Sequence, residues 1–101
     1  MITGKQRAYL RGLANPIETI LYIGKGGITE QVIKQADDAL TARELIKGKT
    51  LENAPLSSRE AAVQLSEILK TEVVQVIGSK FVLYRENPDE PQIKLPKVKK
   101  R

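Results

Sequence analysis

The residues with the clearest potential for chemistry form a glycine-rich segment, Gly24-Lys25-Gly26-Gly27, between a short apolar run and a predicted helix. Glycines let the backbone approach a ligand closely, and a helix start presents unpaired N–H groups at its positive dipole end. Lys25 adds a mobile positive charge, and Thr29 is the expected N-cap of the helix. The segment is therefore a candidate phosphate-binding site, although a strand–glycine turn–helix connection also occurs as plain structure.

Two well-known phosphate-binding motifs do not match this segment. A P-loop requires G-x-x-x-x-G-K-[ST], whereas Lys25 is followed by Gly26 and no such octet occurs in the chain. A dinucleotide fingerprint starting at Gly24 meets Thr29 at the position of its third glycine. The remaining pattern is G-x-x-G, which in KH-type RNA-binding modules clamps the backbone of a few nucleotides.

Catalysis and metal binding have little support in the composition. The chain contains no Cys and no His, which excludes disulfides, thiol nucleophiles, imidazole bases and metal sites built on those ligands. Asp37 and Asp38 are adjacent, so on a helix their side chains diverge and fit a solvated face. Glu44 has no recognisable partner in the sequence, and helix capping explains Ser57. We expect no enzyme activity, no cofactor, no metal and no small-molecule substrate.

The net charge of +5 is unevenly distributed. Residues 93–101 carry the whole excess, so the rest of the chain is neutral, with a net +3 in residues 1–28. Basic segments favour nucleic acid or an anionic membrane surface, although a basic tail is often only solubilising. If the first helix packs beside the glycine loop, Lys5, Arg11 and Lys25 form one positive surface; otherwise the helix charges are merely solvated.

The apolar pattern indicates a single soluble domain. No apolar run approaches the ~20 residues needed to span a bilayer, and nothing resembles a signal peptide, so we expect a cytoplasmic monomer without a membrane partner. The 101 residues fit one compact domain. Aromatic residues are few, and Phe81 is expected in the core. Tyr22 and Tyr84 could stack on a base, but burial is the expectation, so backbone binding should dominate over base stacking.

The elements that must position the glycine loop follow from hydrophobic spacing and capping residues. Residues 3–14 predict a helix capped by Thr3, with Leu10, Leu13 and Ala14 on its inner face. Residues 19–23 predict a strand that is apolar, and so buried, on both faces. A second helix is expected from the Thr29 cap to about Ala42, followed by a strand over 44–49.

The second half of the chain completes a mixed sheet. Ser57 and Glu60 form a capping-box pattern at the start of a third helix, whose inner face includes Ile68. Strands over 73–77 and 81–84 flank a tight hairpin turn. The order α-β-α-β-α-β-β predicts an α/β (α+β) fold, with a four-stranded mixed sheet covered by helices.

The end of the chain differs in composition. We expect a domain over 1–85 and a basic, proline-containing tail over 86–101 that is extended or disordered. Ile93 and Leu95 could pin this tail to an edge of the domain.

Several separated blocks of sequence resemble one known family. These blocks are Leu10-Arg-Gly-Leu-Ala-Asn-Pro-Ile17, Ile23-Gly-Lys-Gly-Gly-Ile-Thr-Glu30, Glu44-Leu-Ile-Lys47, Val74-Gln-Val-Ile-Gly78 and Val82-Leu-Tyr-Arg85. Their order and spacing look like the CRM (chloroplast RNA splicing and ribosome maturation) domain in its small bacterial stand-alone, YhbY-like form. The resemblance covers about residues 3–85.

This resemblance implies a fold related to the C-terminal domain of a translation initiation factor and RNA binding through the glycine loop. For bacterial members it also implies association with precursors of the large ribosomal subunit. Lys47 and Arg85 match family blocks, but Arg85 could equally be a structural ion-pair partner. The loop joins a strand to a helix, whereas in KH modules it joins two helices.

We therefore predict a non-enzymatic RNA-binding protein that binds structured ribosomal RNA and assists assembly of the large subunit. The predicted RNA-binding residues are Gly24, Lys25, Gly26, Gly27, Thr29, Lys5, Arg11 and Lys47. The alternative is a protein-docking adaptor associated with the ribosome, without direct sequence-specific RNA contact.

Overall fold

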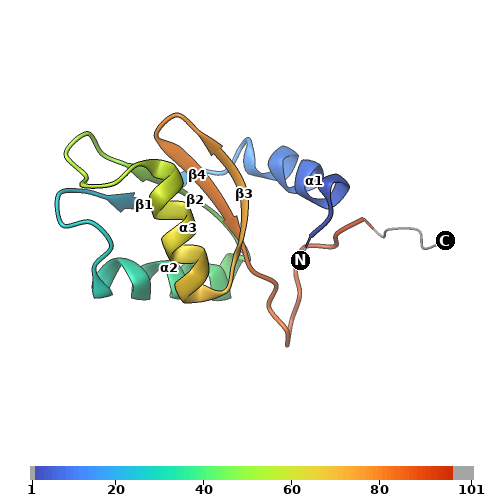
Figure 1. The fold of residues 1–101 in the computed structure, drawn as a ribbon. Coiled ribbons are helices and arrows are strands. Elements are labelled where there is room, and N and C mark those ends of the chain that lie inside the picture. Colours follow the sequence, from blue (N-terminus) through green and yellow to red (C-terminus); the bar gives the residue numbers. More distant parts are fainter. Residues whose placement is uncertain (1, 97–101) are drawn as a thin grey trace.

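The computed structural model describes residues 2–96, and within that range the chain forms three helices and four strands (Figure 1). In chain order they are α1 (Gly4–Ala14), β1 (Thr19–Ile23), α2 (Glu30–Arg43), β2 (Leu45–Thr50), α3 (Ser58–Leu69), β3 (Glu72–Ile77) and β4 (Lys80–Tyr84). The predicted order of elements is confirmed, and most boundaries fall within a residue or two of the expected positions.

Two helices begin with reciprocal capping interactions. At α1 the Thr3 hydroxyl accepts a hydrogen bond from the Gln6 amide at 3.1 Å, and the Gln6 side chain accepts one from the Thr3 amide at 3.0 Å. At α3 the same exchange links Ser57 and Glu60, at 3.1 and 2.8 Å. Each box satisfies backbone donors that a helix start leaves unpaired, which fixes where the helix begins.

The four strands form one mixed sheet in the order β1-β2-β4-β3. β1 runs parallel to β2, whereas β4 is antiparallel to both of its neighbours. The β3–β4 hairpin turns at Gly78, whose φ of 56° lies in the left-handed region that glycine adopts without strain. The predicted four-stranded mixed sheet is therefore confirmed, with β1 and β3 at its edges.

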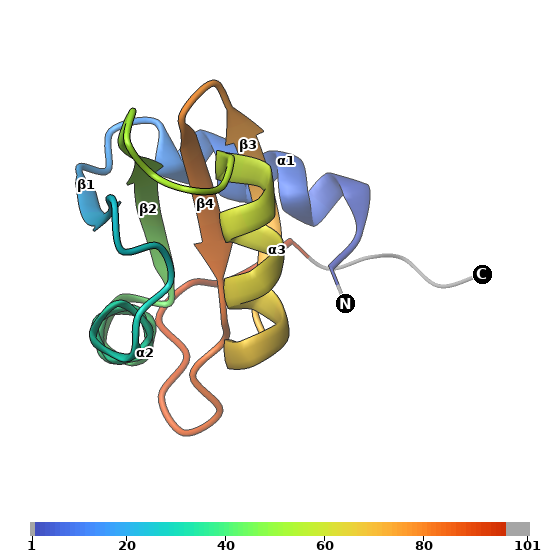
Figure 2. The same ribbon diagram turned by 60° about the vertical axis from the view of Figure 1, so that its left-hand side comes forward.

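Helices cover both faces of the sheet and bury a separate apolar cluster on each (Figure 2). The larger cluster lies under α2 and α3, and its fully buried members include Leu21, Ile46 and Phe81. The smaller cluster lies under α1 on the opposite face and consists of Leu10, Ala14, Leu45, Val74, Val82 and Tyr84. We call these the α2/α3 face and the α1 face of the sheet.

Three apolar side chains are more exposed than the sequence predicted. Tyr22 is 52% exposed, because β1 is an edge strand and α1 does not extend over this part of the α1 face. The expectation that β1 is buried on both faces is therefore wrong. Leu13 and Ile68 were expected on inner helix faces but are partly exposed, because they lie at the margins of those faces.

Glu44, for which the sequence suggested no partner, is fully buried between α2 and β2. One carboxylate oxygen accepts hydrogen bonds from the backbone amides of Gln92 at 2.9 Å and Ile93 at 2.7 Å. The other oxygen accepts one from the amide of Asn87 at 2.7 Å. A buried carboxylate thus holds the segment that follows β4 against the domain.

The same segment also contributes apolar contacts. Residues 86–96 contain no helix or strand, yet Ile93 and Leu95 pack against the cluster on the α1 face. The Gln6 side chain of α1 donates a hydrogen bond to the carbonyl of Pro96 at 3.1 Å. The cations predicted for the end of the tail, at positions 97–101, lie outside the described residues.

Candidate nucleic-acid interface

The glycine segment between β1 and α2 forms a tight turn at one edge of the sheet. The Gly27 amide donates to the Gly24 carbonyl at 3.0 Å, and Gly27 has a φ of 70°. A Cβ atom at Gly27 would lie 3.2 Å from Cγ of Pro55, which belongs to the connection between β2 and α3. Gly27 is therefore glycine for structural reasons, namely a left-handed backbone and close packing.

Gly26 has no comparable structural reason to be glycine. A Cβ atom there would meet only the Thr29 methyl group at 3.4 Å, and the residue is exposed. Lys25 is exposed beside it. The missing side chain at Gly26 leaves the backbone open to close approach from outside, which is what a phosphate-binding turn requires.

The start of α2 lies directly after this turn. Thr29 caps the helix as predicted, because its hydroxyl accepts from the Val32 amide at 3.1 Å. Amides of the first helical turn have no partner within the helix and lie at its positive dipole end. Glu30 also lies in this first turn and is exposed. Its negative charge opposes an anionic ligand, so Lys25 is needed to offset it.

Lys5 and Arg11 are not brought to the glycine turn. Both are exposed on α1, which packs on the α1 face, whereas the turn leads from the edge of the sheet into α2 on the other face. Figure 1 shows α1 and the β1–α2 turn on opposite sides of the molecule. The condition for one positive surface made of Lys5, Arg11 and Lys25 is therefore not met.

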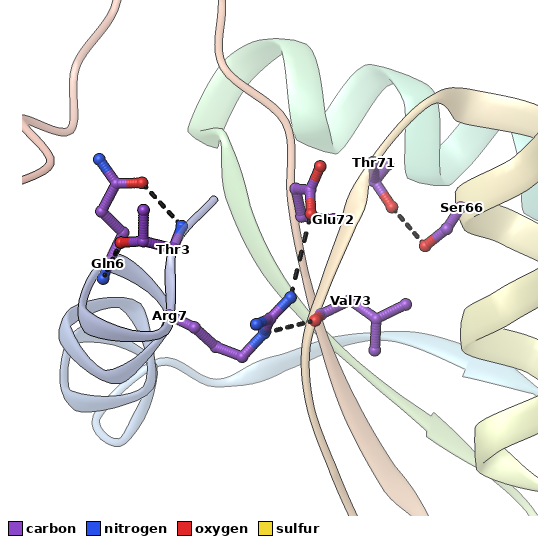
Figure 3. A network of polar contacts seen from close by, with 7 residues as sticks. All are labelled: Thr3, Gln6, Arg7, Ser66, Thr71, Glu72 and Val73. Atoms are coloured by element: carbon purple, nitrogen blue, oxygen red, sulfur yellow. Dashed lines mark hydrogen bonds and ion pairs between the residues drawn. The ribbon is translucent and has the colours of Figure 1, made fainter. Parts of the chain in front are cut away.

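Arg7, a third cation of α1, has a structural role. Its guanidinium donates to the Val73 carbonyl at 3.3 Å and lies 4.0 Å from the Glu72 carboxylate, which ties α1 to β3 (Figure 3). The nearby Ser66 and Thr71 hydroxyls hydrogen-bond at 2.6 Å where α3 passes into β3. The contacts of Arg7 with Val73 and Glu72 direct its guanidinium to β3 rather than to an external ligand.

Arg85 also has a structural role. Of the two roles that the sequence left open, RNA contact and a structural ion pair, the structure shows the ion pair. Its guanidinium lies 2.8 Å from the Asp37 carboxylate and donates to the Leu69 carbonyl at 3.1 Å and the Thr41 hydroxyl at 3.0 Å. It therefore joins the end of β4 to α2 and α3. Asp37, expected on a purely solvated face, is instead half-exposed and ion-paired.

Lys47 lies on β2 with its side chain on the α1 face, because its neighbour Ile46 belongs to the cluster under α2 and α3. Sequence reasoning missed the two lysines that accompany it, Lys49 and Lys80. Lys49 is two residues further along the same strand, and Lys80 pairs with Lys49 across β2 and β4. Tyr22 pairs with Lys49 across β1 and β2. The sequence did contain one signal for this surface: Lys47 and Lys49 are two residues apart in β2, so their side chains project from the same face of the sheet.

The comparisons with known proteins agree with the resemblance inferred from the sequence. The CRS1 / YhbY (CRM) domain matches residues 2–85. The chain belongs to this family. It is similar to the protein named "Probable RNA-binding protein YqeI" of Bacillus subtilis, with 42% identity over 95% of this chain and 100% of the relative. It is also 33% identical to a Haemophilus influenzae protein named "RNA-binding protein", over 95% of this chain and 96% of the relative.

A solved structure shares the fold of this chain. The solution structure of a hypothetical protein of Staphylococcus aureus matches with a TM-score of 0.79 and 53% sequence identity, over 95% of this chain and 100% of the other. The predicted family and fold class are thus confirmed. Among residues 2–96 no helix combines the length and hydropathy of a membrane span, and no cluster of acidic side chains could hold a metal ion.

Proposed function

We propose that this CRM-domain protein binds RNA and that residues 24–27, with the start of α2, hold phosphates of the RNA backbone. The observation that carries this proposal is Gly26: an exposed glycine that the fold does not require, between Lys25 and a helix N-terminus. Relatives of this chain are named as RNA-binding proteins, which supports RNA as the source of the phosphate. Backbone amides and one lysine suit a phosphodiester without selecting a base.

The proposed target is structured ribosomal RNA in precursors of the large subunit, and the proposed role is non-enzymatic assistance of assembly. This part rests on the family resemblance. A backbone-dominated interface predicts a strong dependence on salt. If about five phosphates are neutralised, log K should fall by roughly 3.5–4.5 for a tenfold rise in salt concentration.

The loop is tested with a double variant and a matched control. Lys25→Ala/Gly26→Asp places a negative charge where the phosphate would lie, and the open space at Gly26 accommodates the new side chain. Lys5→Ala/Gly12→Asp makes the same two changes on α1, where a Cβ atom at Gly12 meets nothing within 4 Å. Both variants lower the net charge equally, so they separate a local site from general attraction.

We expect the loop variant to bind ribosomal RNA at least about tenfold more weakly, which is the effect of losing about 1.4 kcal/mol of binding free energy. Its thermal melting curve should stay close to that of the unaltered protein. The α1 variant should keep most of its affinity. Equal retention of RNA by both variants in a filter-binding titration would refute the loop as the phosphate site.

The ribosomal target is tested by crosslinking in cells. Ultraviolet crosslinking followed by sequencing should place the protein on large-subunit ribosomal RNA and its precursors, and the loop variant should lose those crosslinks. Crosslinks found mainly on other RNAs would contradict the ribosomal role. Association with ribosomal particles without any RNA crosslink would instead favour the protein-docking adaptor.

A further inference from the structure

One row of four side chains crosses the whole sheet on the α1 face. Tyr22 on β1 pairs with Lys49 on β2, Lys49 pairs with Lys80 on β4, and Lys80 pairs with Ile77 on β3. Residues paired directly across strands project from the same face of a sheet. Ile23 and Phe81, the sequence neighbours of Tyr22 and Lys80, belong to the cluster on the other face, which fixes the direction of the row. We call these four residues the cross-strand row.

Three of the four side chains of the cross-strand row are exposed to solvent, and Lys49 is half-buried. Tyr22 is 52% exposed, Ile77 is 62% exposed, and Lys80 is also exposed. The cluster under α1 includes Val82 and Tyr84 but no member of the row, so α1 covers only the other end of this face. The two large apolar side chains at the ends of the row are thus each more than half exposed.

A basic pocket lies beside the row on the α1 face. Lys47 lies on β2 two residues before Lys49, on the same face of the sheet. With Lys80, Gln75 and Ile77 it lines a pocket of about 140 Å³ that has no acidic residue in its lining. None of the salt bridges between described residues involves Lys47, Lys49 or Lys80. The positive charges are therefore available to an anionic partner rather than neutralised within the fold.

We propose that the cross-strand row binds unpaired nucleotides of the RNA whose backbone the glycine turn holds; this inference rests on the proposed function. The exposed ring of Tyr22 stacks on a base, Lys49 and Lys80 contact the phosphates on either side, and Ile77 packs against a further base or ribose. Aromatic stacking beside a positively charged track is the usual chemistry of single-strand binding, and it tolerates any base.

A single strand fits the row better than a duplex. Three strand spacings of about 4.8 Å give the row a length of roughly 14 Å, enough for a few nucleotides. Stacking on Tyr22 requires an unstacked base, which a continuous double helix does not offer. Tyr22, at one end of the row, lies two residues before Gly24, so the row and the proposed phosphate site share one edge of the sheet.

The test uses the full chain and two RNA probes, a non-self-complementary single strand of about 15 nucleotides and its blunt duplex. Tyr22→Leu removes the ring while keeping an apolar side chain, and Tyr22→Phe keeps the ring. Tyr9→Leu is the matched control, because Tyr9 is also exposed, at 43%, but lies on α1. A Lys49→Ala/Lys80→Ala variant removes the two charges of the row.

We expect Tyr22→Leu to weaken single-strand binding by about fivefold or more, and Tyr22→Phe and Tyr9→Leu to change it by less than about twofold. The lysine variant should lower the slope of log K against log salt by about 1.4, since each phosphate contact with a single strand contributes roughly 0.7. The unaltered protein should prefer the single strand to the duplex. Circular dichroism melting checks that each variant folds.

The outcomes separate this inference from the proposed function. If Lys25→Ala/Gly26→Asp abolishes binding but the variants of the row bind like the unaltered protein, the row is refuted while the loop stands. An equal affinity for duplex and single strand also overturns the inference. If the variants of the row lose binding and the loop variant does not, the row is supported and the loop assignment is refuted.

Discussion

Replacing Glu44 should release the segment that follows β4. The Glu44 carboxylate is fully buried and accepts three backbone hydrogen bonds of 2.7–2.9 Å from that segment. Glu44→Ala leaves those three amides without an acceptor. Glu44→Gln keeps the oxygen that bonds Gln92 and Ile93, but turns an amide NH₂ towards the amide of Asn87, so one bond is lost.

The expected cost can be worked from these contacts. A hydrogen bond to a charged group contributes about 1.5–3 kcal/mol, so three of them set an upper limit of roughly 4.5–9 kcal/mol. The actual cost should be smaller, because residues 86–96 can detach and their amides become hydrated, at the expense of the contacts of Ile93 and Leu95. We therefore expect about 3–5 kcal/mol for Glu44→Ala and about 1–3 kcal/mol for Glu44→Gln.

Two measurements check this prediction. Denaturant melts give the free energy of unfolding, and limited proteolysis reports cleavage within residues 86–96 before the domain itself is cut. Glu67→Ala on the exposed side of α3 is the control and should change stability by less than about 0.5 kcal/mol. The reasoning is refuted if Glu44→Ala stays within about 1 kcal/mol of the unaltered protein and its segment 86–96 remains equally resistant.

Two further predictions concern the sheet. Gly48→Ala should cost about 1–3 kcal/mol in a denaturant melt, because the new methyl group would lie 2.7 Å from Cε1 of the Phe81 ring. The Tyr84 hydroxyl is buried without a hydrogen-bond partner among the described residues, and burial, with the carboxylates of Glu44 and Glu86, raises its pKa to about 12. An unfolded tyrosine ionises near pH 10, so the contribution of Tyr84 to stability should be constant below that pH and fall between pH 10 and 12. Tyr84→Phe should remove this part of the fall and raise stability at pH 7 by about 1 kcal/mol.

Helices and strands were predictable because their signals are local. The pairs Thr3–Gln6 and Ser57–Glu60 are three residues apart, and both capping boxes form. The helix α1 ends at Ala14, as Asn15-Pro16 predicted, but not for the expected reason: Asn15 keeps helical backbone angles (φ −51°, ψ −49°). The chain leaves the helix at Pro16, which has no N–H to continue the helical hydrogen bonds. The mixed sheet followed from the order of these elements.

The position of α1 could not be predicted by the same means. Apolar spacing shows that Leu10 and Ala14 face a core, but it does not show which face of the sheet supplies that core. The sequence therefore left open whether Lys5 and Arg11 lie beside the glycine turn. Their separation from it depends on the packing of α1 against β2 and β3, strands that follow much later in the chain.

The role of Glu44 was hidden for a related reason. Its hydrogen-bond donors lie 43 to 49 residues away in the sequence, so no spacing rule connects them. Its backbone is also unusual, with a φ of 66° at the end of α2 that a non-glycine residue rarely adopts. The sequence therefore showed no partner for Glu44, because its burial and its donors arise only when the chain folds.

The cross-strand row was predictable from the sequence only in part. A strand with both faces covered is apolar throughout, so Lys47 and Lys49, two residues apart on β2, already indicate that one face of the sheet is partly open. The sequence does not show which residues of neighbouring strands lie beside Lys47 and Lys49. Their identity depends on the register between strands, and β1 and β3 each contain an irregularity that shifts the pairing. Since a one-residue slip turns every side chain to the other face, only the folded sheet could place Tyr22 beside Lys49.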